Sequence, residues 1–379
     1  MGQLRTRKRG TTWEWSFEGA LIGGKRNPSS KGGYRTKAES LAAGTQAKAE
    51  FENYVKMNLA HNTQMDYARK IRIHLNPTFG KYRLAALETD VIQKWVDEMK
   101  RHGYSRSMVK NTLACLSGAL NYAVYPCKYI KYNPCDYVKV PKIITPEEVK
   151  AHTEYICSKK DFAAIIDRFG PDSNFYLPLM TGYHCGTRLG ESYGIDLLHD
   201  VNFEEHTLAV RYQLANEDGK WYYRSPKYGS VRTIKILPEY EKILKGEIHK
   251  RKKNMLRYGQ YFTKTYQMKE GLIFQAPANI TIVGQEIMPI SVKEGSELLT
   301  PNSFKYCAKV IHEELGNPLF HSHCLRHTHG TMLAENGAQP KTVMERLGHK
   351  DISTTLNRYI FNTEKMKDDA MAILAEAIS

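Results

Sequence analysis

The spacing of hydrophobic and polar residues divides the chain into a β-rich start, a helical stretch and a longer mixed region. Across residues 12–18, three aromatic residues alternate with polar ones, which predicts a strand with one buried face. The pair Gly32-Gly33 is predicted to form a turn between short strands, and Thr36 and Glu39 have the spacing of a helix capping box. Residues 1–53 are therefore predicted to form a small three-stranded sheet with a helix.

Residues 54–140 carry apolar positions at helical spacing. One stripe begins at Val91 and ends before Gly103, and a second runs from Val109 to Val124. Apolar stripes of this kind line the buried face of amphipathic helices, and lysines and arginines occupy the other faces here. This stretch is predicted to be a helical domain with its own core.

The remaining residues, 145–379, are predicted to form a mixed α/β domain, so that the whole chain is mainly α with small β elements. Thr145 and Glu148 again form a capping box, here with proline at the first helical position. Helices are expected to about Gly182 and again after Pro301. Between them the pattern predicts strands at residues 207–214, 221–224 and 233–237, a hairpin turn at Asp218-Gly219, an inserted hairpin or loop at 261–299, and a last helix at 364–378.

The charge of the chain narrows the class of partner. Its 379 residues carry a net charge of +15. A protein this basic commonly binds a polyanion, and nucleic acid is favoured because neutralised phosphates release counterions. An anionic membrane surface is the alternative, but the sequence has neither a basic amphipathic helix nor a lipidation signal.

Apolar runs and cysteines indicate the compartment. No apolar run is long enough to span a bilayer, and the first ten residues lack the apolar segment of a signal peptide. The seven cysteines are scattered and form no C-x-x-C pair, which favours reduced thiols packed in cores. A cytoplasmic protein is expected.

Basic residues are concentrated in the N-terminal module. Before Glu39, only Glu14 and Glu18 oppose them. A run of charge is usually a solvated surface, but so one-sided a run on a small sheet favours contact with DNA phosphates. The residues expected to make this contact are Arg5, Lys8, Arg9, Lys25, Arg26, Lys31 and Arg35.

Four short patterns in the second half contain residues suited to phosphate chemistry. Arg188 precedes Glu191 by three residues, so that on a helix the carboxylate can hold the guanidinium. Lys227 is expected at the tip of the proposed hairpin, although Lys220 and Lys235 lie nearby. Each pattern alone is weak, because surface Arg–Glu pairs, lysines in turns and single tyrosines are common. The other two patterns are His323-Cys324-Leu325-Arg326-His327, and Leu347-Gly348-His349 followed by Tyr359.

Four histidines lie between residues 321 and 329, so a metal site is the competing interpretation. His323 and His327 have the i, i+4 spacing of zinc ligands on a helix. No acidic residue lies between them, where an H-E-x-x-H site has its glutamate, and no phosphate-binding GxxxxGK[ST] loop is present. Neither a metal nor another cofactor is therefore expected.

The order of these patterns resembles the tyrosine recombinase (phage integrase) family, in particular integrases of Gram-positive conjugative transposons and prophages. Residues 323–331 match H-x-L-R-H-T-x-G-T, and residues 347–355 match L-G-H-x-x-I-x-T-T, with Tyr359 ten positions after His349. The resemblance covers nearly the whole chain, although residues 185–188 keep the first arginine motif only loosely and 261–299 exceed the minimal fold. It implies an arm-type DNA-binding domain at 1–53, a SAM-like core-binding domain at 54–140, and a catalytic domain with a C-terminal tail helix at 145–379.

The resemblance implies a site-specific recombinase that integrates and excises a mobile element without metal or ATP. Tyr359 would attack the DNA phosphorus and leave a 3′-phosphotyrosine, while Arg188 and Arg326 would hold the non-bridging oxygens. His323 is expected as general base or acid, Lys227 as the acid for the leaving 5′-hydroxyl, His349 as a hydrogen-bond donor to the phosphate, and Glu191 as a support for Arg188 or His323.

The resemblance also implies partners. These are double-stranded DNA at the attachment sites of an element, three further copies of the chain in a tetrameric synapse with exchange of C-terminal helices, and an excisionase or DNA-bending protein. The expected location is the bacterial cytoplasm at the nucleoid. No membrane partner is expected.

Three other classes share part of the pattern. A DNA-binding regulator on this scaffold has no reason to keep all six catalytic candidates. A type IB topoisomerase shares the chemistry but acts as a monomer, whereas the basic N-terminal module and the apolar stripe of the C-terminal tail favour recombination. A protelomerase-like resolvase is separated only by the overall resemblance.

Overall fold

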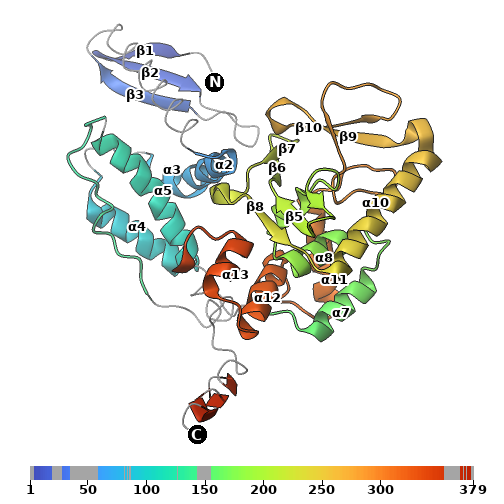
Figure 1. Cartoon of the computed structure of the whole chain (residues 1–379). Coiled ribbons are helices and arrows are strands. Elements are labelled where there is room, and N and C mark those ends of the chain that lie inside the picture. Colours follow the sequence, from blue (N-terminus) through green and yellow to red (C-terminus); the bar gives the residue numbers. More distant parts are fainter. Residues whose placement is uncertain are drawn as a thin grey trace. The chain divides into compact units, whose positions relative to one another are not determined.

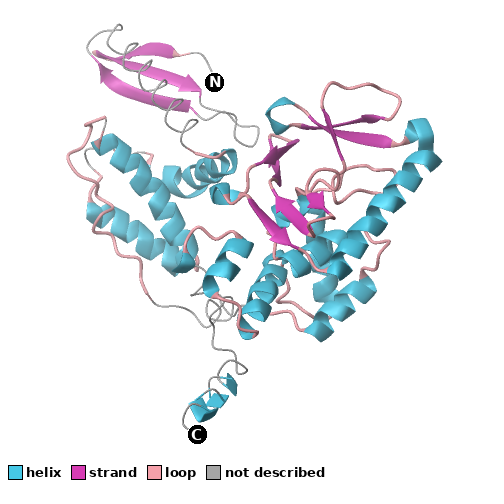
Figure 2. Cartoon of the chain, in the orientation of Figure 1, coloured by secondary structure: helices cyan, strands magenta, loops and turns pink. Residues whose placement is uncertain are grey.

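The computed structural model describes residues 4–18, 28–34, 59–80, 87–125, 127–142 and 155–353, with isolated positions beyond these ranges. The chain divides into two compact units, residues 1–152 and 153–379. Helices are the main component of the described residues and the sheets are small, as the sequence predicts (Figures 1 and 2). The predicted helix starts at Thr36 and Thr145, and most of the predicted tail helix, lie outside the described residues.

The N-terminal strands are β1 (Arg5–Arg9), β2 (Thr12–Glu18) and β3 (Pro28–Tyr34), and β2 pairs antiparallel with both of the others. The predicted turn at Gly32-Gly33 is wrong, because both glycines lie inside β3. The register of β2 against β3 shifts at this point, where Trp13 faces Tyr34 and Trp15 faces Lys31. One extra residue on β3 is a β-bulge, and glycine, which lacks Cβ, adopts the backbone that a bulge needs.

The helical part of the first unit has one core. The two apolar stripes predicted from the sequence lie on α4 and α5, where Ile92, Val96 and Val109 are completely buried. Ser105 caps α5 by accepting a hydrogen bond from the Met108 amide at 3.1 Å. The helices are α2 (His61–Lys70), the π-helical turn Ile71–Leu75, α3 (Asn76–Phe79), α4 (Thr89–Arg101) and α5 (Arg106–Val124).

An irregular segment with several turns, residues 127–142, follows α5 and is bonded to it by Asn133. The buried Asn133 amide donates to the Ser117 hydroxyl at 2.9 Å and to the Asn121 side chain at 2.8 Å, and its oxygen accepts from the Cys135 amide at 2.9 Å. The segment is therefore ordered by a buried polar network, although it contains neither helix nor strand.

The second unit surrounds small sheets with helices, and α12 and α13 lie next to one another at its C-terminal end (Figure 1). No helix in the described part of the chain is long and apolar enough to cross a membrane. The helices are α7 (Lys159–Arg168), α8 (Tyr176–Cys185), α9 (Leu189–Tyr193), α10 (Pro238–Tyr258), α11 (Phe304–Glu313), α12 (Ser322–Glu335) and α13 (Pro340–Leu347). The strands are β4 (Val201–Asn202), β5 (Thr207–Val210), β6 (Gln213–Glu217), β7 (Lys220–Arg224), β8 (Arg232–Lys235), β9 (Thr263–Gln267), β10 (Ile273–Pro277) and β11 (Gln285–Ile287).

The strand predicted over residues 207–214 is wrong as a single element. It bends at Arg211 and Tyr212, so that β5 joins the sheet β4-β5-β8 whereas β6 pairs with β7. At the bend, Arg211 forms an ion pair with the buried Asp200, and the Tyr212 carbonyl packs so closely on Gly194 that a Cβ there would lie 2.5 Å from its oxygen. These contacts from distant residues make the bend, which alternation of residues along the strand does not encode.

The turn between β6 and β7 and the segment 261–299 were also predicted from the sequence. Asp218 and Gly219, with φ of 50° and 84°, connect β6 to β7, as the Asp-Gly signal for a hairpin predicts. Most of the segment 261–299, predicted as an inserted hairpin or loop, is organised around a three-stranded antiparallel sheet of order β10-β9-β11.

Candidate active site

Arg188, which is partly exposed, forms an ion pair with the buried Glu191 at the start of α9. Arg188 is the residue just before the helix and Glu191 lies in its first turn, so the two do not share a helix face as the spacing suggested. The Glu191 carboxylate, which is completely buried, accepts from Arg188 Nη1 at 2.6 Å and from the Arg188 backbone amide at 3.0 Å. The carboxylate thus holds both ends of the arginine.

The same guanidinium connects segments that are far apart in the sequence. Arg188 Nη2 donates to the Gly348 carbonyl at 3.1 Å, directly before His349. Arg188 Nη1 lies 3.3 Å from the hydroxyl of Ser230, which ends the short helical turn that contains Lys227. The start of α9, the turn after β7 and the end of α13 therefore meet around one cation.

Arg326 reaches the same place from α12. It is 3% exposed, and its Nη1 donates to the Gly186 carbonyl at 2.9 Å, two residues before Arg188. Gly186 has a φ of +64°, and a Cβ on it would lie 2.7 Å from both His329 and Leu347. Only glycine allows α8, α12 and α13 to approach this closely, and their approach brings the Arg326 guanidinium to the backbone two residues before Arg188.

His323 lies one turn before Arg326 on α12 and is exposed. Its ring centroid is 6.4 Å from that of His327 and 6.5 Å from that of His321. Within the described ranges, no three His, Cys, Asp or Glu side chains are grouped so that they could hold a metal ion.

Lys227 does not lie at a hairpin tip, and that part of the prediction is wrong. The tip of the β6–β7 hairpin is Asp218-Gly219, whereas Lys227 begins the 3-10 turn Lys227–Gly229 that connects β7 to β8. Both Tyr228 and Gly229 have positive φ, so the chain reverses tightly here. Lys227 is exposed on this turn, and the Ser230 contact holds the turn near Arg188.

The backbone of His349 is fixed by the end of α13. Gly348 adopts the left-handed conformation with φ of 66°, and its amide donates to the Glu345 carbonyl at 3.1 Å. The His349 amide donates to the Met344 carbonyl, also at 3.1 Å, which completes a glycine-terminated helix end. Tyr359 lies outside the described residues.

Two arginines at the site were not singled out by the sequence. Arg232 Nη2 donates to Glu191 at 2.9 Å, so that Glu191 bridges Arg188 and Arg232. Burial raises the pKa of the Glu191 carboxyl, but the Arg232 and Arg188 guanidiniums outweigh this effect and hold the pKa below its ordinary value. Arg346, on α13, donates from Nε to His329 Nε2 at 2.8 Å.

Comparison with known proteins identifies the class. Residues 144–366 match the phage integrase family, and residues 49–100 match the N-terminal SAM-like domain of phage integrases. The first match alone spans more than half of the 379 residues, and the chain therefore belongs to the phage integrase family of tyrosine recombinases. It is a site-specific DNA recombinase, an enzyme that exchanges DNA strands.

Individual relatives are distant. The chain is 26% identical over 331 residues to a XerC-like tyrosine recombinase of Caldanaerobacter subterraneus subsp. tengcongensis, covering 84% of this chain and 79% of that protein. It is 26% identical over 303 residues to a probable integrase of prophage ps2 of Lactococcus lactis subsp. lactis, covering 77% and 72%. Among solved structures, the Tn1549 transposon integrase in complex with transposon right-end DNA superposes with a TM-score of 0.65 at 22% identity, covering 87% of this chain and 98% of that one. The structural likeness extends the shared fold over both units.

Proposed function

We propose that the chain cuts and rejoins attachment-site DNA through Tyr359, with the cluster around Arg188 binding the phosphate that Tyr359 attacks. The observation that carries this proposal is the set of contacts of Arg188, which join the α9 start to the turn of Lys227 and to Gly348, beside His349. Arg326 joins the cluster through the Gly186 carbonyl. The segments that carry Lys227 and His349 thus meet around Arg188, and Arg326 bonds to the backbone two residues before it.

The reaction consists of two phosphoryl transfers, strand cleavage and strand joining. Tyr359 Oη forms a bond to phosphorus as the bond from phosphorus to the 5′-oxygen breaks, which leaves a 3′-phosphotyrosine and a free 5′-hydroxyl. The tyrosine proton passes to His323, because a phenol of ordinary pKa about 10 is a poor nucleophile at neutral pH. Lys227 donates the proton that the leaving 5′-oxygen takes up. Attack by a different 5′-hydroxyl reverses these steps and joins the exchanged strand.

The arginines carry the electrostatic part of catalysis. Arg188 and Arg326 bind the non-bridging oxygens, where negative charge gathers in the pentacoordinate transition state. His349 donates a further hydrogen bond. Glu191 keeps the Arg188 guanidinium in place before DNA arrives, so little reorganisation is needed during the reaction. Removal of one such donor costs about 3–4 kcal/mol of barrier in other enzymes.

The domains divide the work of DNA binding. Residues 1–53, with their three-stranded sheet, act as the arm-binding domain, residues 54–140 as the SAM-like core-binding domain and residues 145–379 as the catalytic domain. The SAM-like match at residues 49–100 supports the second assignment. The boundary between the compact units, after residue 152, supports a division in the same region of the chain.

In the arm-binding domain, Arg5 and Lys8 on β1 are both exposed and available to DNA phosphates. Arg9 also belongs to this expected set, but its Nε is paired with the buried Glu14 at 2.6 Å, so its charge is partly compensated before DNA binds. Arg5 and Lys8 therefore contribute more to binding than Arg9. Nothing is described for the side chains of Lys25, Arg26, Lys31 and Arg35.

The segment 127–142 with Tyr125 adds a second basic surface in the first unit. Four tyrosines of this stretch are at least half exposed, and lysines alternate with them. Tyrosine hydroxyls and lysine ammonium groups are typical donors to DNA phosphates, and Asn133 keeps the segment ordered. The residues are Tyr125, Tyr129, Tyr132 and Tyr137 with Lys128, Lys131 and Lys139.

The exchange of two duplexes calls for four copies of the chain, with C-terminal tail helices docked on neighbouring copies. An excisionase or a DNA-bending protein is the expected accessory factor. The place of action is the bacterial nucleoid in the cytoplasm, where the attachment sites are.

The test is a covalent-complex assay. Labelled duplexes that carry the joined ends of the element encoding this chain are incubated with the full protein in EDTA, then separated on denaturing gels with and without protease. We expect a protein-linked DNA band that resists SDS and is absent with Tyr359→Phe. The phenylalanine variant should bind the duplexes with unchanged affinity, because it removes only one hydroxyl. A band that persists with Tyr359→Phe would falsify the assignment of the nucleophile.

A further inference from the structure

Each of the three guanidinium nitrogens of Arg232 donates a hydrogen bond beside the candidate site. It opens β8 and its side chain is 8% exposed. Its Nη2 donates to Glu191 Oε2 at 2.9 Å, its Nε to the Arg346 carbonyl at 2.7 Å and its Nη1 to the Ser230 carbonyl at 3.2 Å. One planar group therefore contacts the support of Arg188 and both of the turns that flank it.

We infer that Arg232 is a positioning residue for strand cleavage, which holds Arg188 through Glu191 and fixes the turns that carry Lys227 and His349. The inference rests on the proposed role of Arg188 at the phosphate. Arg232 itself is buried behind these groups and acts through them rather than on the DNA.

The two oxygens of Glu191 are held from different sides. Oε1 accepts from Arg188 Nη1, whereas Oε2 accepts from Arg232 and from the Arg188 backbone amide. A carboxylate whose two oxygens are held from different sides cannot rotate, so the Arg188 guanidinium has a fixed direction. Without Arg232, Oε2 keeps only the backbone amide among these donors, and the buried carboxylate loses half of its charge compensation.

The contact between Arg232 and Glu191 also sets the net charge of the site. Glu191 compensates only one of the two guanidiniums that it bonds, so the group of Arg188, Glu191 and Arg232 keeps one positive charge in addition to that of Arg326. Without Arg232, the Arg188–Glu191 pair would have no net charge and would attract a phosphate only weakly. The sharing with Arg232 therefore keeps the site positive while each group stays hydrogen-bonded.

Arg232 also bonds to the C-terminal end of α13. The last carbonyls of a helix have no partner within it, and Arg232 Nε supplies one to the Arg346 carbonyl. A Cβ on Gly348 would lie 2.9 Å from Arg232 Nη1 and 3.0 Å from Ser230 Cβ. The glycine of the Leu347-Gly348-His349 motif thus leaves room for the guanidinium beneath the turn.

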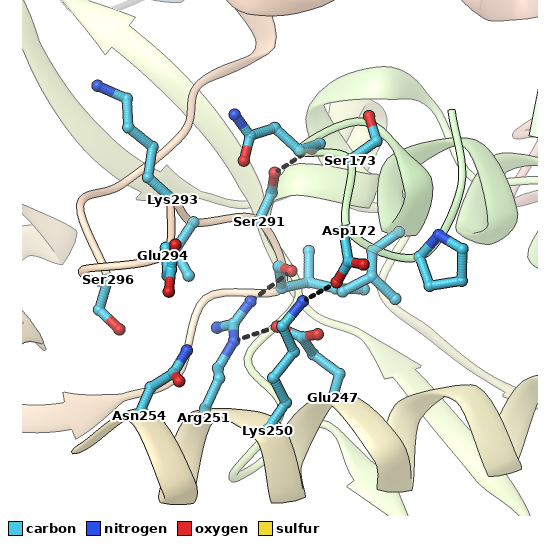
Figure 3. A pocket seen from close by; sticks show the side chains of 15 residues that line it. Asp172, Ser173, Glu247, Lys250, Arg251, Asn254, Ser291, Lys293, Glu294 and Ser296 are labelled. Atoms are coloured by element: carbon cyan, nitrogen blue, oxygen red, sulfur yellow. Dashed lines mark hydrogen bonds and ion pairs between the residues drawn. The ribbon is translucent and has the colours of Figure 1, made fainter. Parts of the chain in front are cut away.

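A matched control exists in the same unit. The Arg251 side chain on α10 is 5% exposed, close to the 8% of Arg232, and it bonds to the Glu247 carboxylate at 2.6 Å (Figure 3). Like Arg232, it also donates to two backbone carbonyls, here those of Pro289 and Ile290. It lines a cavity of about 430 Å³ whose walls contain none of the candidate catalytic residues. Arg251→Lys therefore removes a similar set of buried hydrogen bonds but leaves the cluster around Arg188 unchanged.

The experiment compares Arg232→Lys and Arg251→Lys in the full protein. The single-turnover rate of covalent adduct formation is measured at saturating protein on duplexes carrying the joined element ends, together with the Kd and the thermal unfolding temperature. We expect Arg232→Lys to slow the adduct about 10- to 100-fold with a Kd within about threefold of wild type, as for other supports of catalytic groups. Arg251→Lys should unfold at a similarly lowered temperature with a wild-type rate per folded molecule.

A second substrate separates positioning from general damage. A methylphosphonate at the cleaved position is neutral, so the direction of Arg188 matters less to its attack. The rate loss of Arg232→Lys should shrink to within about threefold on this substrate, because the ordered guanidinium acts on phosphate charge. An equal loss on both substrates, or a wild-type rate for Arg232→Lys on the phosphodiester, would overturn the inference. If instead the proposed function were wrong, wild type and Tyr359→Phe would form the same amount of covalent adduct, which distinguishes that outcome from failure of the role of Arg232.

Discussion

At the scale of single residues, His329 shows how α12 and α13 are joined. Its Nδ1 donates to the Tyr183 carbonyl at 2.8 Å and its Nε2 accepts from Arg346 Nε at 2.8 Å. Only the neutral ring with its proton on Nδ1 can make both bonds, an assignment that follows from the partners. Burial, and then the charge of Arg346, lower the pKa of His329 to about 4.

This lowered pKa predicts a pH-dependent stability. Below pH 6.5 the unfolded chain protonates His329, whereas the folded chain keeps it neutral down to about pH 4. The unfolded state therefore binds more protons across this window, and the contribution of His329 is complete above pH 6.5 and is lost as the pH falls. The loss amounts to roughly 3 kcal/mol by pH 4.

The measurement is the free energy of unfolding of wild type and His329→Gln between pH 4 and pH 7.5. The difference between the two should shrink steadily as the pH falls below 6.5, because glutamine does not titrate. His323→Gln, at an exposed position of the same helix, serves as the comparison and should show a much smaller change with pH. A His329→Gln difference that is constant over the whole range would contradict the assigned neutral state.

The catalytic candidates and the support Glu191 could be predicted from the sequence, but the supports Arg232 and Arg346 could not. Arg326 and His349 stand in motifs whose residues are adjacent, so a short pattern identifies them. Arg232 is recognised only by its partners, Glu191 at 41 positions before it and Arg346 at 114 positions after it. A supporting residue of this kind is defined by the fold, and no local pattern marks it.

At the scale of elements, the bend between β5 and β6 positions α9, which carries Glu191. Gly194, directly after α9, packs on the backbone of Tyr212 and Gln213 at this bend. The Asp-Gly turn of the β6–β7 hairpin was predictable, because positive φ at two adjacent positions selects these residues. The bend between β5 and β6 was not predictable, because a close contact between two backbone segments requires only a glycine in the sequence, and a glycine alone does not identify its partner.

Alanine substitution at two glycines should therefore give opposite results. In Gly194→Ala the new Cβ meets the Tyr212 carbonyl at 2.5 Å, and since backbone cannot move aside cheaply, we expect a loss of roughly 1–3 kcal/mol. Gly246→Ala, inside α10 with nothing within 4 Å, should gain about 0.5–1 kcal/mol from helix propensity. Chemical denaturation of both variants checks this, and equal effects at the two sites would refute the role given to the Gly194 contact.

At the scale of the whole molecule, the distribution of charge is more informative than its total. A net charge of +15 predicts attraction to any polyanion, whereas phosphate contacts require cations on the surface that meets DNA. Lys128, Lys131 and Lys139 lie exposed beside the tyrosines of segment 127–142. On α10, Lys242, Lys252 and Lys253 are also exposed but none of them bonds to the Arg188 cluster among the described contacts.

Two triple variants with the same net charge separate local contacts from overall attraction. Replacement of Lys128, Lys131 and Lys139 by glutamine should weaken DNA binding and reduce the slope of log K against log salt by up to about 2.7, at about 0.9 for each lost phosphate contact. The same replacement of Lys242, Lys252 and Lys253 should leave the slope nearly unchanged. The measurement is fluorescence anisotropy with one labelled attachment-site duplex at several salt concentrations. If both variants reduce the slope equally, DNA responds to the total charge of the protein, and segment 127–142 is not a phosphate-binding surface.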